Sequence, residues 1–125
     1  HWALVPCQLG IYSLEGLADL LEMVDEFANL RRDVDPSRFC RILLTMVDNR
    51  LKRSTEYVTK ELEPYQDRIL QTKIRRNDAL NQAQAAGLSI FHFNRESYGA
   101  VDYYQLIEEV LAYEQARVPA QPALQ

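Results

Sequence analysis

The sequence predicts an α/β domain in which a mainly parallel sheet is flanked by helices. Short apolar segments alternate along the chain with longer segments whose apolar residues recur every three or four positions. This alternation requires crossover connections, which favour parallel strands covered by helices. The chain has 125 residues, of which 47% are hydrophobic and 26% are charged, as expected of one domain with one sizeable core.

Four segments are predicted as strands. Residues 2–6 form a short apolar run that is closed by a proline, and residues 39–47 (FCRILLTMV) are so apolar that we expect cover on both faces. Residues 68–74 alternate between apolar and polar side chains. The segment LSIFHF, residues 88–93, is predicted as a fourth, short strand.

The first two predicted helices follow the first two strands. Residues 13–33 carry one apolar stripe, with Ser13 expected as N-cap. The stripe consists of Leu14, Leu17, Leu21, Val24, Phe27 and Leu30. Residues 54–66 predict a shorter helix that ends near Pro64.

Two further helices are predicted in the second half of the chain. Residues 77–87 suit a short helix with Asn77 or Asp78 as cap and Gly87 as stop. Residues 98–117 predict a long helix. Its inward face is expected to hold Val101, Tyr104, Ile107, Val110 and Leu111. We expect one domain over residues 1–116 and a flexible tail over 117–125.

The cysteines and the hydropathy pattern indicate a cytoplasmic protein with no membrane association. Cys7 and Cys40 both lie in apolar runs, where buried reduced thiols are expected in preference to a disulfide or a ligand pair. No apolar stretch approaches the roughly 20 residues of a membrane span, and no signal-peptide pattern is present. Because the sequence opens directly on an apolar run, HWALVPCQLG, we expect it to be a piece of a longer protein.

Positive charge is concentrated in one part of an acidic chain. Residues 50–76 hold eight basic and four acidic side chains, so this segment carries +4 and the remainder −8, within a net charge of −4. The densest basic groups each follow a predicted strand. They are Arg50, Lys52 and Arg53, and then Lys73, Arg75 and Arg76.

If both of these strands are parallel, the two basic groups meet at one rim of the sheet, where open α/β sheets bind ligands. Guanidinium groups at such a rim suit phosphates of a nucleotide or of a nucleic-acid backbone. The alternative is a solvated basic surface that pairs with nearby carboxylates such as Asp48 and Asp78. Composition alone leaves both interpretations open.

The sequence lacks the motifs of phosphate-binding loops, zinc sites and serine nucleophiles. The chain has four glycines, none of which is followed by lysine, and it contains no GxGxxG, so there is no phosphate-binding P-loop. His1 and His92 are isolated, without the cysteine or histidine spacing of a zinc site. No serine lies in a glycine-elbow context. We therefore expect no catalysis by this chain alone.

The chain resembles the C-terminal half of the ParA/Soj partitioning ATPases, a group within the ParA/MinD family of P-loop proteins with a deviant Walker A motif. The resemblance runs from about residue 3 to residue 111. It rests on ALVPCQLGIYSLEGLADLLEMV, RILLTMVDNR, KIRRNDALNQAQAAGLSI and FHFNRESYGAVDYYQLIEEVL, which occur in the family's order.

The resemblance implies the later half of a doubly wound P-loop NTPase sheet. It also implies that the phosphate-binding loop, the magnesium-handling switch regions and the Walker B aspartate precede this segment. The intact protein is then expected to bind ATP and Mg, to dimerise, to bind DNA non-specifically on the nucleoid, and to meet a ParB-type partner. No cofactor is expected for this segment alone.

The resemblance also assigns residues. The adenine side of the nucleotide pocket is expected at Met46, Asp48, Arg76 and Asn77. The DNA-contact residues are expected to be Arg50, Lys73, Arg75 and Arg76. The sequence departs from the family's pattern at three places. Arg75 stands where the family usually has a proline before the arginine at position 76, and Gln82-Ala83 stands where it has Glu-Ala. Ser89 stands where the family has the proline of its Gly-x-Pro.

Three hypotheses follow. The first is a segment of a ParA-like ATPase in plasmid, chromosome or cargo partitioning, and the second is a DNA-binding module that acts through backbone electrostatics. The third is a degenerate interaction or dimerisation domain without ATPase activity. In the family, the strand before the phosphate-binding loop pairs with the strand equivalent to residues 2–6. Because that partner strand is not part of this sequence, we also expect self-association through the exposed edge of residues 2–6.

Overall fold

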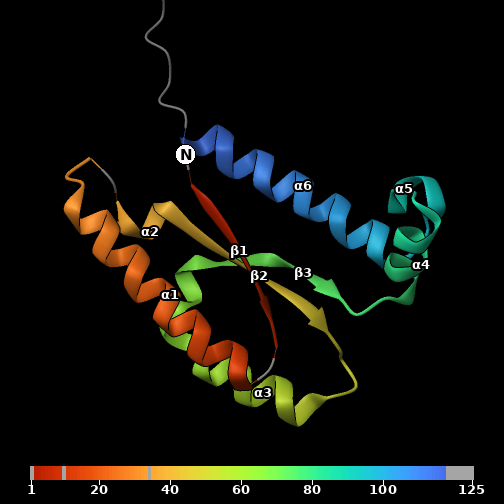
Figure 1. The fold of residues 1–125 in the computed structure, drawn as a ribbon, viewed down its shortest axis with the longest axis horizontal. Coiled ribbons are helices and arrows are strands. Elements are labelled where there is room, and N and C mark those ends of the chain that lie inside the picture. Colours follow the sequence, from red (N-terminus) through yellow and green to blue (C-terminus); the bar gives the residue numbers. More distant parts are fainter. Residues whose placement is uncertain (1, 10, 34, 118–125) are drawn as a thin grey trace, which may run out of the picture.

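The computed structural model describes residues 2–9, 11–33 and 35–117. These residues fold into a three-stranded parallel sheet with helices on both faces (Figure 1). The strands are β1 (Ala3–Gln8), β2 (Cys40–Val47) and β3 (Ile69–Arg75), in the spatial order β1-β2-β3. The helices are α1 (Ile11–Leu30), α2 (Pro36–Phe39), α3 (Lys52–Glu61), the 3₁₀ turn η1 (Glu63–Arg68), α4 (Asp78–Ala86), α5 (Ile90–Phe93) and α6 (Tyr98–Arg117).

The α/β class and the parallel sheet are confirmed. β1 pairs with β2 in continuous register from Ala3 opposite Cys40 to Gln8 opposite Thr45. β2 pairs with β3 less regularly, with Val47 opposite Arg75 at the end. All three strands therefore end at the same rim of the sheet.

The core consists of two layers, one on each face of the sheet. On one face α1 and α3 bury Leu21, Ile42 and Leu62 together with the thiol of Cys40, which is wholly inaccessible to solvent. On the other face α6 packs against β3, where Leu106 contacts the layer formed by Leu43, Leu70 and Ile74. Cys7 and Cys40 are both free and buried, as predicted.

The predicted fourth strand is wrong. Residues 90–93 form the one-turn helix α5, because Ser89 acts as an N-cap: its Oγ accepts a hydrogen bond from the backbone N–H of His92 at 3.2 Å. Ile90 is thereby buried against Ala83 and Ala100. Local capping, combined with a small apolar cluster between α4 and α6, takes the place of strand pairing.

The ends of α1 also differ from expectation. The helix begins at Ile11, two residues before Ser13, so Ser13 is not its N-cap. Leu17 and Leu21 are buried as predicted, but the stripe leaves the core in the last turn, where Phe27 and Leu30 are exposed. By contrast, α4 begins after Asn77 and ends at Gly87 with φ of 66°, the left-handed conformation expected of a glycine stop.

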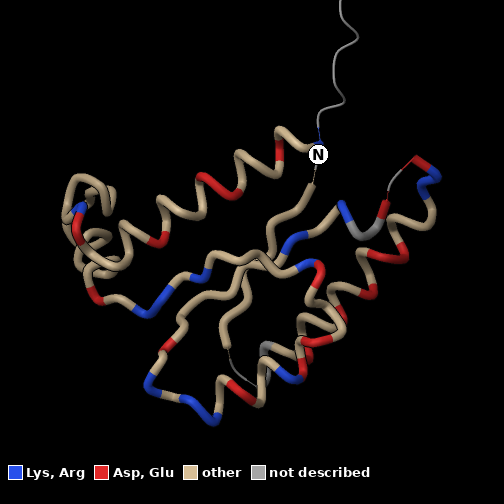
Figure 2. Tube along the Cα trace, turned by 180° about the vertical axis from the view of Figure 1, so that it is seen from behind, with Lys and Arg blue, Asp and Glu red and all other residues tan. Residues whose placement is uncertain are grey.

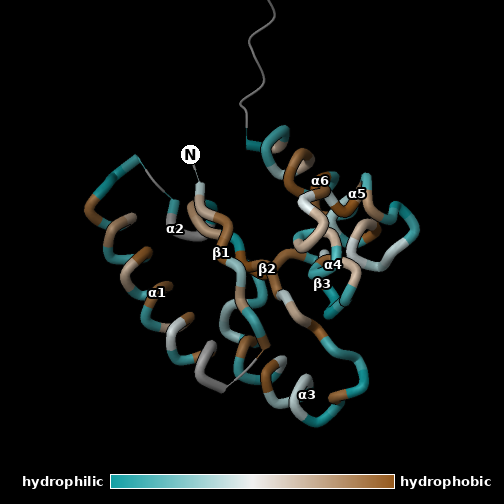
Figure 3. The backbone as a smooth tube through the Cα atoms, turned by 45° about the vertical axis from the view of Figure 1, so that its right-hand side comes forward, coloured by the Kyte–Doolittle hydropathy of each residue, from teal (hydrophilic) through white to brown (hydrophobic). Residues whose placement is uncertain are grey.

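The inward face predicted for α6 is wrong at four of its five residues, whereas Val110 packs against the layer of Leu43, Leu70 and Ile74 as predicted. Val101, Tyr104, Ile107 and Leu111 are 40 to 58% exposed, and Figure 3 shows hydrophobic stretches along this helix. The buried face instead comprises Gly99, Ala100, Asp102 and Leu106. Two carboxylates account for this rotation: Asp102 binds Arg75, and Glu109 accepts hydrogen bonds from the edge amides of β3 at Gln71 and Thr72 (2.6 and 3.0 Å).

No helix in the described ranges is long and apolar enough to cross a membrane. The tail predicted over 117–125 begins with Arg117, the last residue of α6, and residues 118–125 lie outside the described residues.

Candidate nucleotide-binding hollow

A hollow of about 510 Å³ lies at the carboxyl ends of β2 and β3, which we call the strand-end hollow. Its lining combines guanidinium, amide and apolar side chains: Thr45, Met46, Arg50, Ile74, Arg75, Arg76, Asn77, Asp78, Leu80, Asn81 and Tyr103. Two stretches of Lys and Arg reach this end of the sheet from separate loops (Figure 2). The structure therefore brings Arg50 and Arg76 to the same rim.

Met46 enters the hollow through a bulge in β2. From Leu44 to Val47 this strand advances three residues, whereas its partner advances two, from Lys73 to Arg75. Met46 takes up the extra residue with φ of 56°, a left-handed conformation that is unfavourable for a side chain of this size. Bulges of this kind re-aim a side chain at the end of a strand. The Met46 side chain is left 43% exposed.

Asp48 and Arg50 form a bidentate ion pair in the loop after β2. Asp48 Oδ1 accepts hydrogen bonds from the backbone N–H and from Nε of Arg50 at 3.0 and 2.9 Å, and Oδ2 accepts from Nη2 at 2.8 Å. These hydrogen bonds, with a smaller contribution from the charge of Arg76, lower the pKa of Asp48 to about 2. The pairing that the sequence left open as an alternative is thus present. It still leaves 86% of the Arg50 side chain exposed.

Arg76 and Asn77 turn the chain from β3 into α4. The backbone N–H of Arg76 donates to the carbonyl of Val47 at 2.9 Å, which fixes the turn against the end of β2. Asn77 is the N-cap residue of α4, but its side chain makes no capping hydrogen bond. Its Oδ1 is buried and has no hydrogen-bond partner among the described residues. A buried acceptor of this kind favours a ligand that brings a donor.

Arg75 is held by α6. The carboxylate of Asp102 is 4% exposed and accepts from the Arg75 backbone N–H at 2.9 Å and from Nη2 at 2.8 Å, with further bonds from Nε. The guanidinium also stacks on the ring of Tyr98, 4.1 Å from its centroid. The hydrogen bonds to Asp102 raise the pKa of Arg75 further. Most of the donors of Arg75 are therefore engaged within the fold.

Lys73 lies apart from the other basic residues. It lines a neighbouring hollow between β3, α3 and η1, together with Thr59 and Gln66. Sequence reasoning missed Tyr98, Asp102 and Tyr103. These residues lie about 20 or more positions beyond the basic groups, and only the packing of α6 on β3 brings them there.

The strand-end hollow suits a flat heteroaromatic ring that carries anionic groups. Met46, Leu80 and Tyr103 offer apolar surface, Asn77 offers an unpaired acceptor, and the guanidinium of Arg76 offers positive charge. A parallel sheet with such a rim is an α/β arrangement of the kind in which ligands lie beyond the carboxyl ends of the strands.

Comparison with known proteins finds relatives among the partitioning ATPases. Over 86% of its length the chain is 34% identical to the chromosome-partitioning ATPase Soj of Thermus thermophilus and 31% identical to the sporulation initiation inhibitor protein Soj of Bacillus subtilis. Over 93% of its length it is 26% identical to the chromosome partitioning protein ParA of Myxococcus xanthus. No family model matches the chain.

The chain is therefore a relative of the ParA and Soj partitioning ATPases, and the resemblance seen in its sequence is confirmed. It spans about two fifths of the length of these curated relatives, between 40 and 43%. This coverage is consistent with a C-terminal portion, and the three-stranded parallel sheet matches part of a P-loop NTPase sheet.

Proposed function

We propose that this chain forms the adenine-side wall of the nucleotide site of a ParA-like ATPase that acts in plasmid, chromosome or cargo partitioning. In this proposal, polypeptide outside the 125 residues supplies the phosphate-binding loop and the Mg²⁺ ligands. The chain is expected to hydrolyse no ATP by itself. The complete protein is expected to dimerise, to lie on the nucleoid in the cytoplasm, and to respond to a ParB-type partner.

The observation that carries the proposal is that Asn77 lines the strand-end hollow while its buried Oδ1 has no hydrogen-bond partner in the part of the chain that the structure describes. An adenine ring presents an exocyclic amino group, which would satisfy this acceptor. Its faces would lie against Met46 and Tyr103, and Arg76 would remain near the ribose and phosphates. Leaving a buried acceptor unpaired costs about 1 to 3 kcal/mol, and a ligand would recover part of that free energy.

The test is titration of adenosine, AMP and purine riboside, which lacks the exocyclic amino group, into the purified chain by calorimetry or by NMR chemical shifts. We expect weak binding of the adenine compounds, with Kd on the order of 1 mM because only one wall of the site is present. Asn77→Ala should weaken this binding about fivefold. Asn29→Ala, on the exposed side of α1, is the matched control and should change nothing. Equal binding of purine riboside, or an unchanged Asn77→Ala variant, would contradict the proposal.

We also propose that the basic rim contacts the DNA backbone. The four residues assigned to this role are Arg50, Lys73, Arg75 and Arg76, and each phosphate contact contributes about 0.9 to the slope of log K against log salt. Arg76 is exposed at the rim, whereas Arg75 is bound to Asp102. Arg76→Ala should therefore lower the slope by about 0.9, and Arg75→Ala by much less. Equal losses for the two variants would show that the ion pair opens on DNA.

The alternative function is a ParA-like interaction or dimerisation domain without ATPase activity. The observation that favours it is the exposed apolar stripe on α6, which is unusual for a free surface. ATP turnover by the purified chain, free of contaminating ATPase, would exclude this alternative and would also overturn the expectation that the chain alone is inactive.

A further inference from the structure

Arg50 is exposed at the rim of the sheet and is nevertheless held in a fixed orientation. Its side chain is 86% exposed, yet Nε and Nη2 donate to Oδ1 and Oδ2 of Asp48 at 2.9 and 2.8 Å. This fork is the geometry in which a carboxylate fixes the plane of a guanidinium group. Because an exposed ion pair adds little to stability, the orientation of Arg50 is the more informative consequence of the pair.

The pair leaves one edge of the Arg50 guanidinium group open. Asp48 occupies the edge formed by Nε and Nη2. Nη1 has no hydrogen-bond partner in the part of the chain that the structure describes, so Nη1 and the second N–H of Nη2 remain free to donate. These donors form another edge of the fork, which matches two oxygens of a phosphate group.

Asp48 itself does not line the strand-end hollow. Its side chain is 13% exposed, and the residues that line the hollow include Arg50 and Arg76 but not Asp48. The charge of Arg76 nonetheless contributes to the lowered pKa of Asp48, so this second guanidinium group is also near the carboxylate. Asp48 thus lies beside two arginines from different loops and acts on a ligand of the rim through them.

We propose that Asp48 is a positioning residue, which holds Arg50 so that its free edge meets a phosphate of the DNA backbone beside Arg76. This inference rests on the DNA contact proposed above and adds to it a residue whose charge has the same sign as the ligand. An unrestrained arginine loses rotamer freedom when it binds a phosphate. In this structure Asp48 has removed that freedom before the phosphate arrives.

Two effects of the Asp48 carboxylate on DNA binding oppose each other. By charge alone the carboxylate repels DNA, but two charges about 7 Å apart in water at about 0.1 M salt repel by less than about a factor of two. Holding one rotamer-rich side chain in its bound orientation is worth roughly two- to tenfold in affinity. Orientation therefore outweighs repulsion, and a neutral residue at position 48 should weaken DNA binding although it removes a negative charge.

The decisive experiment measures binding of the complete 125-residue chain to a short labelled DNA duplex by fluorescence anisotropy. Asp48→Asn keeps an Oδ1 that accepts the backbone N–H of Arg50, so the turn is retained, but its amide cannot accept from both Nε and Nη2. It should weaken binding about threefold. The matched control is Asp78→Asn at the same rim, where the carboxylate accepts from Gln82 and from no arginine among the described residues. This control should strengthen binding slightly, as charge alone predicts.

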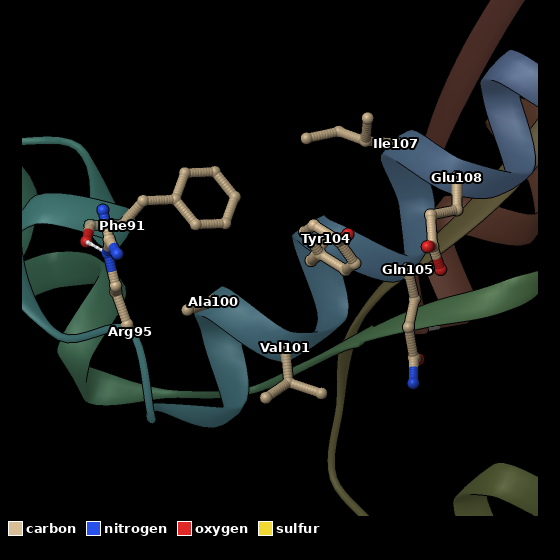
Figure 4. A pocket seen from close by; sticks show the side chains of 8 residues that line it. All are labelled: Phe91, Arg95, Ala100, Val101, Tyr104, Gln105, Ile107 and Glu108. Atoms are coloured by element: carbon tan, nitrogen blue, oxygen red, sulfur yellow. Dashed lines mark hydrogen bonds between the residues drawn. The ribbon is translucent and has the colours of Figure 1, made fainter.

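Arginine variants separate orientation from charge. Arg50→Lys keeps the charge but loses the fork, and it should also weaken binding about threefold. Because Asp48 acts only through the guanidinium group, D48N/R50K should bind no more weakly than Arg50→Lys alone. Arg95→Lys should bind like wild type, since Arg95 lines the groove between α5 and α6, where its Nε donates to the carbonyl of Phe91 at 3.2 Å (Figure 4).

Each contrary result has a separate meaning. Tighter or unchanged DNA binding by Asp48→Asn, or a further loss in D48N/R50K, overturns the positioning role and leaves the DNA contact standing. A wild-type chain that binds no duplex at about 20 mM salt overturns both, while the adenosine titration still decides the adenine wall. If Asp48→Asn lowers the affinity for AMP but not for adenosine, and leaves DNA binding unchanged, the phosphate belongs to a nucleotide and the proposal is wrong.

Discussion

Removing the carboxylate of Asp102 should destabilise the fold more than any other change at the strand-end rim. Asp102→Ala deletes a 4% exposed acceptor and leaves the Arg75 backbone N–H and guanidinium without their partner. Breaking a fully buried ion pair costs about 3 to 5 kcal/mol, but Arg75 is 33% exposed and can regain water. We therefore expect the free energy of unfolding to fall by about 2 to 3 kcal/mol.

Urea denaturation of a double-mutant cycle measures this coupling. The cycle combines Asp102→Ala with Arg75→Met, which keeps the length of the side chain but removes its charge. Because the two groups share several hydrogen bonds, the double variant should be more stable than the sum of the single losses predicts, by about 1 to 3 kcal/mol. Losses that add within about 0.5 kcal/mol would refute the reasoning, since the pair would then contribute nothing specific.

Three other predictions concern separate parts of the molecule. Asp48 has a pKa of about 2 in the fold, below the ordinary 3.8. The stability that the fold gains from its ion pair with Arg50 should therefore be complete above about pH 4 and lost toward pH 2. The difference in the free energy of unfolding between wild type and Asp48→Asn, measured against pH, should follow this course. Gly99→Ala should lower the free energy of unfolding by about 1 to 3 kcal/mol, because its Cβ would lie 2.7 Å from Cγ of Leu80. Burial raises the pKa of the Cys40 thiol, so iodoacetamide should label it only as fast as the fold opens, as mass spectrometry with and without urea would show.

The sheet and the rim could be predicted because local rules determine them. The apolar run of β2 and the alternation of β3 indicate strands, and the intervening helical segment forces them to be parallel. Parallel strands must end at one edge, so the basic groups that follow them meet there whatever the details of packing. The meeting of Arg50 and Arg76 in one hollow depends on nothing else.

The detail of the hollow could not be predicted in this way. Met46 adopts a left-handed conformation because β2 has one residue more than β3 between two paired positions. No local pattern in either strand predicts this extra residue. Segment 88–93 has the composition of a strand, but the Ser89 cap and the small cluster around Ala83 make a helical turn more favourable. At Met46 a contact with the partner strand outweighs the local preference, whereas in segment 88–93 a local cap acts together with contacts from α4 and α6.

The orientation of α6 shows why apolar periodicity alone failed. The helix carries apolar residues on two sides, and hydrophobicity does not distinguish between them. Asp102 and Glu109 decide the matter, because Arg75 and the edge amides of β3 are polar groups that need partners where the helix crosses the strand. Burying the Tyr104 side instead would leave those groups unpaired, at a cost of about 1 to 3 kcal/mol each. The polar groups at the edge of β3 thus need the Asp102 and Glu109 side of α6, and the more apolar side of the helix is left facing outward.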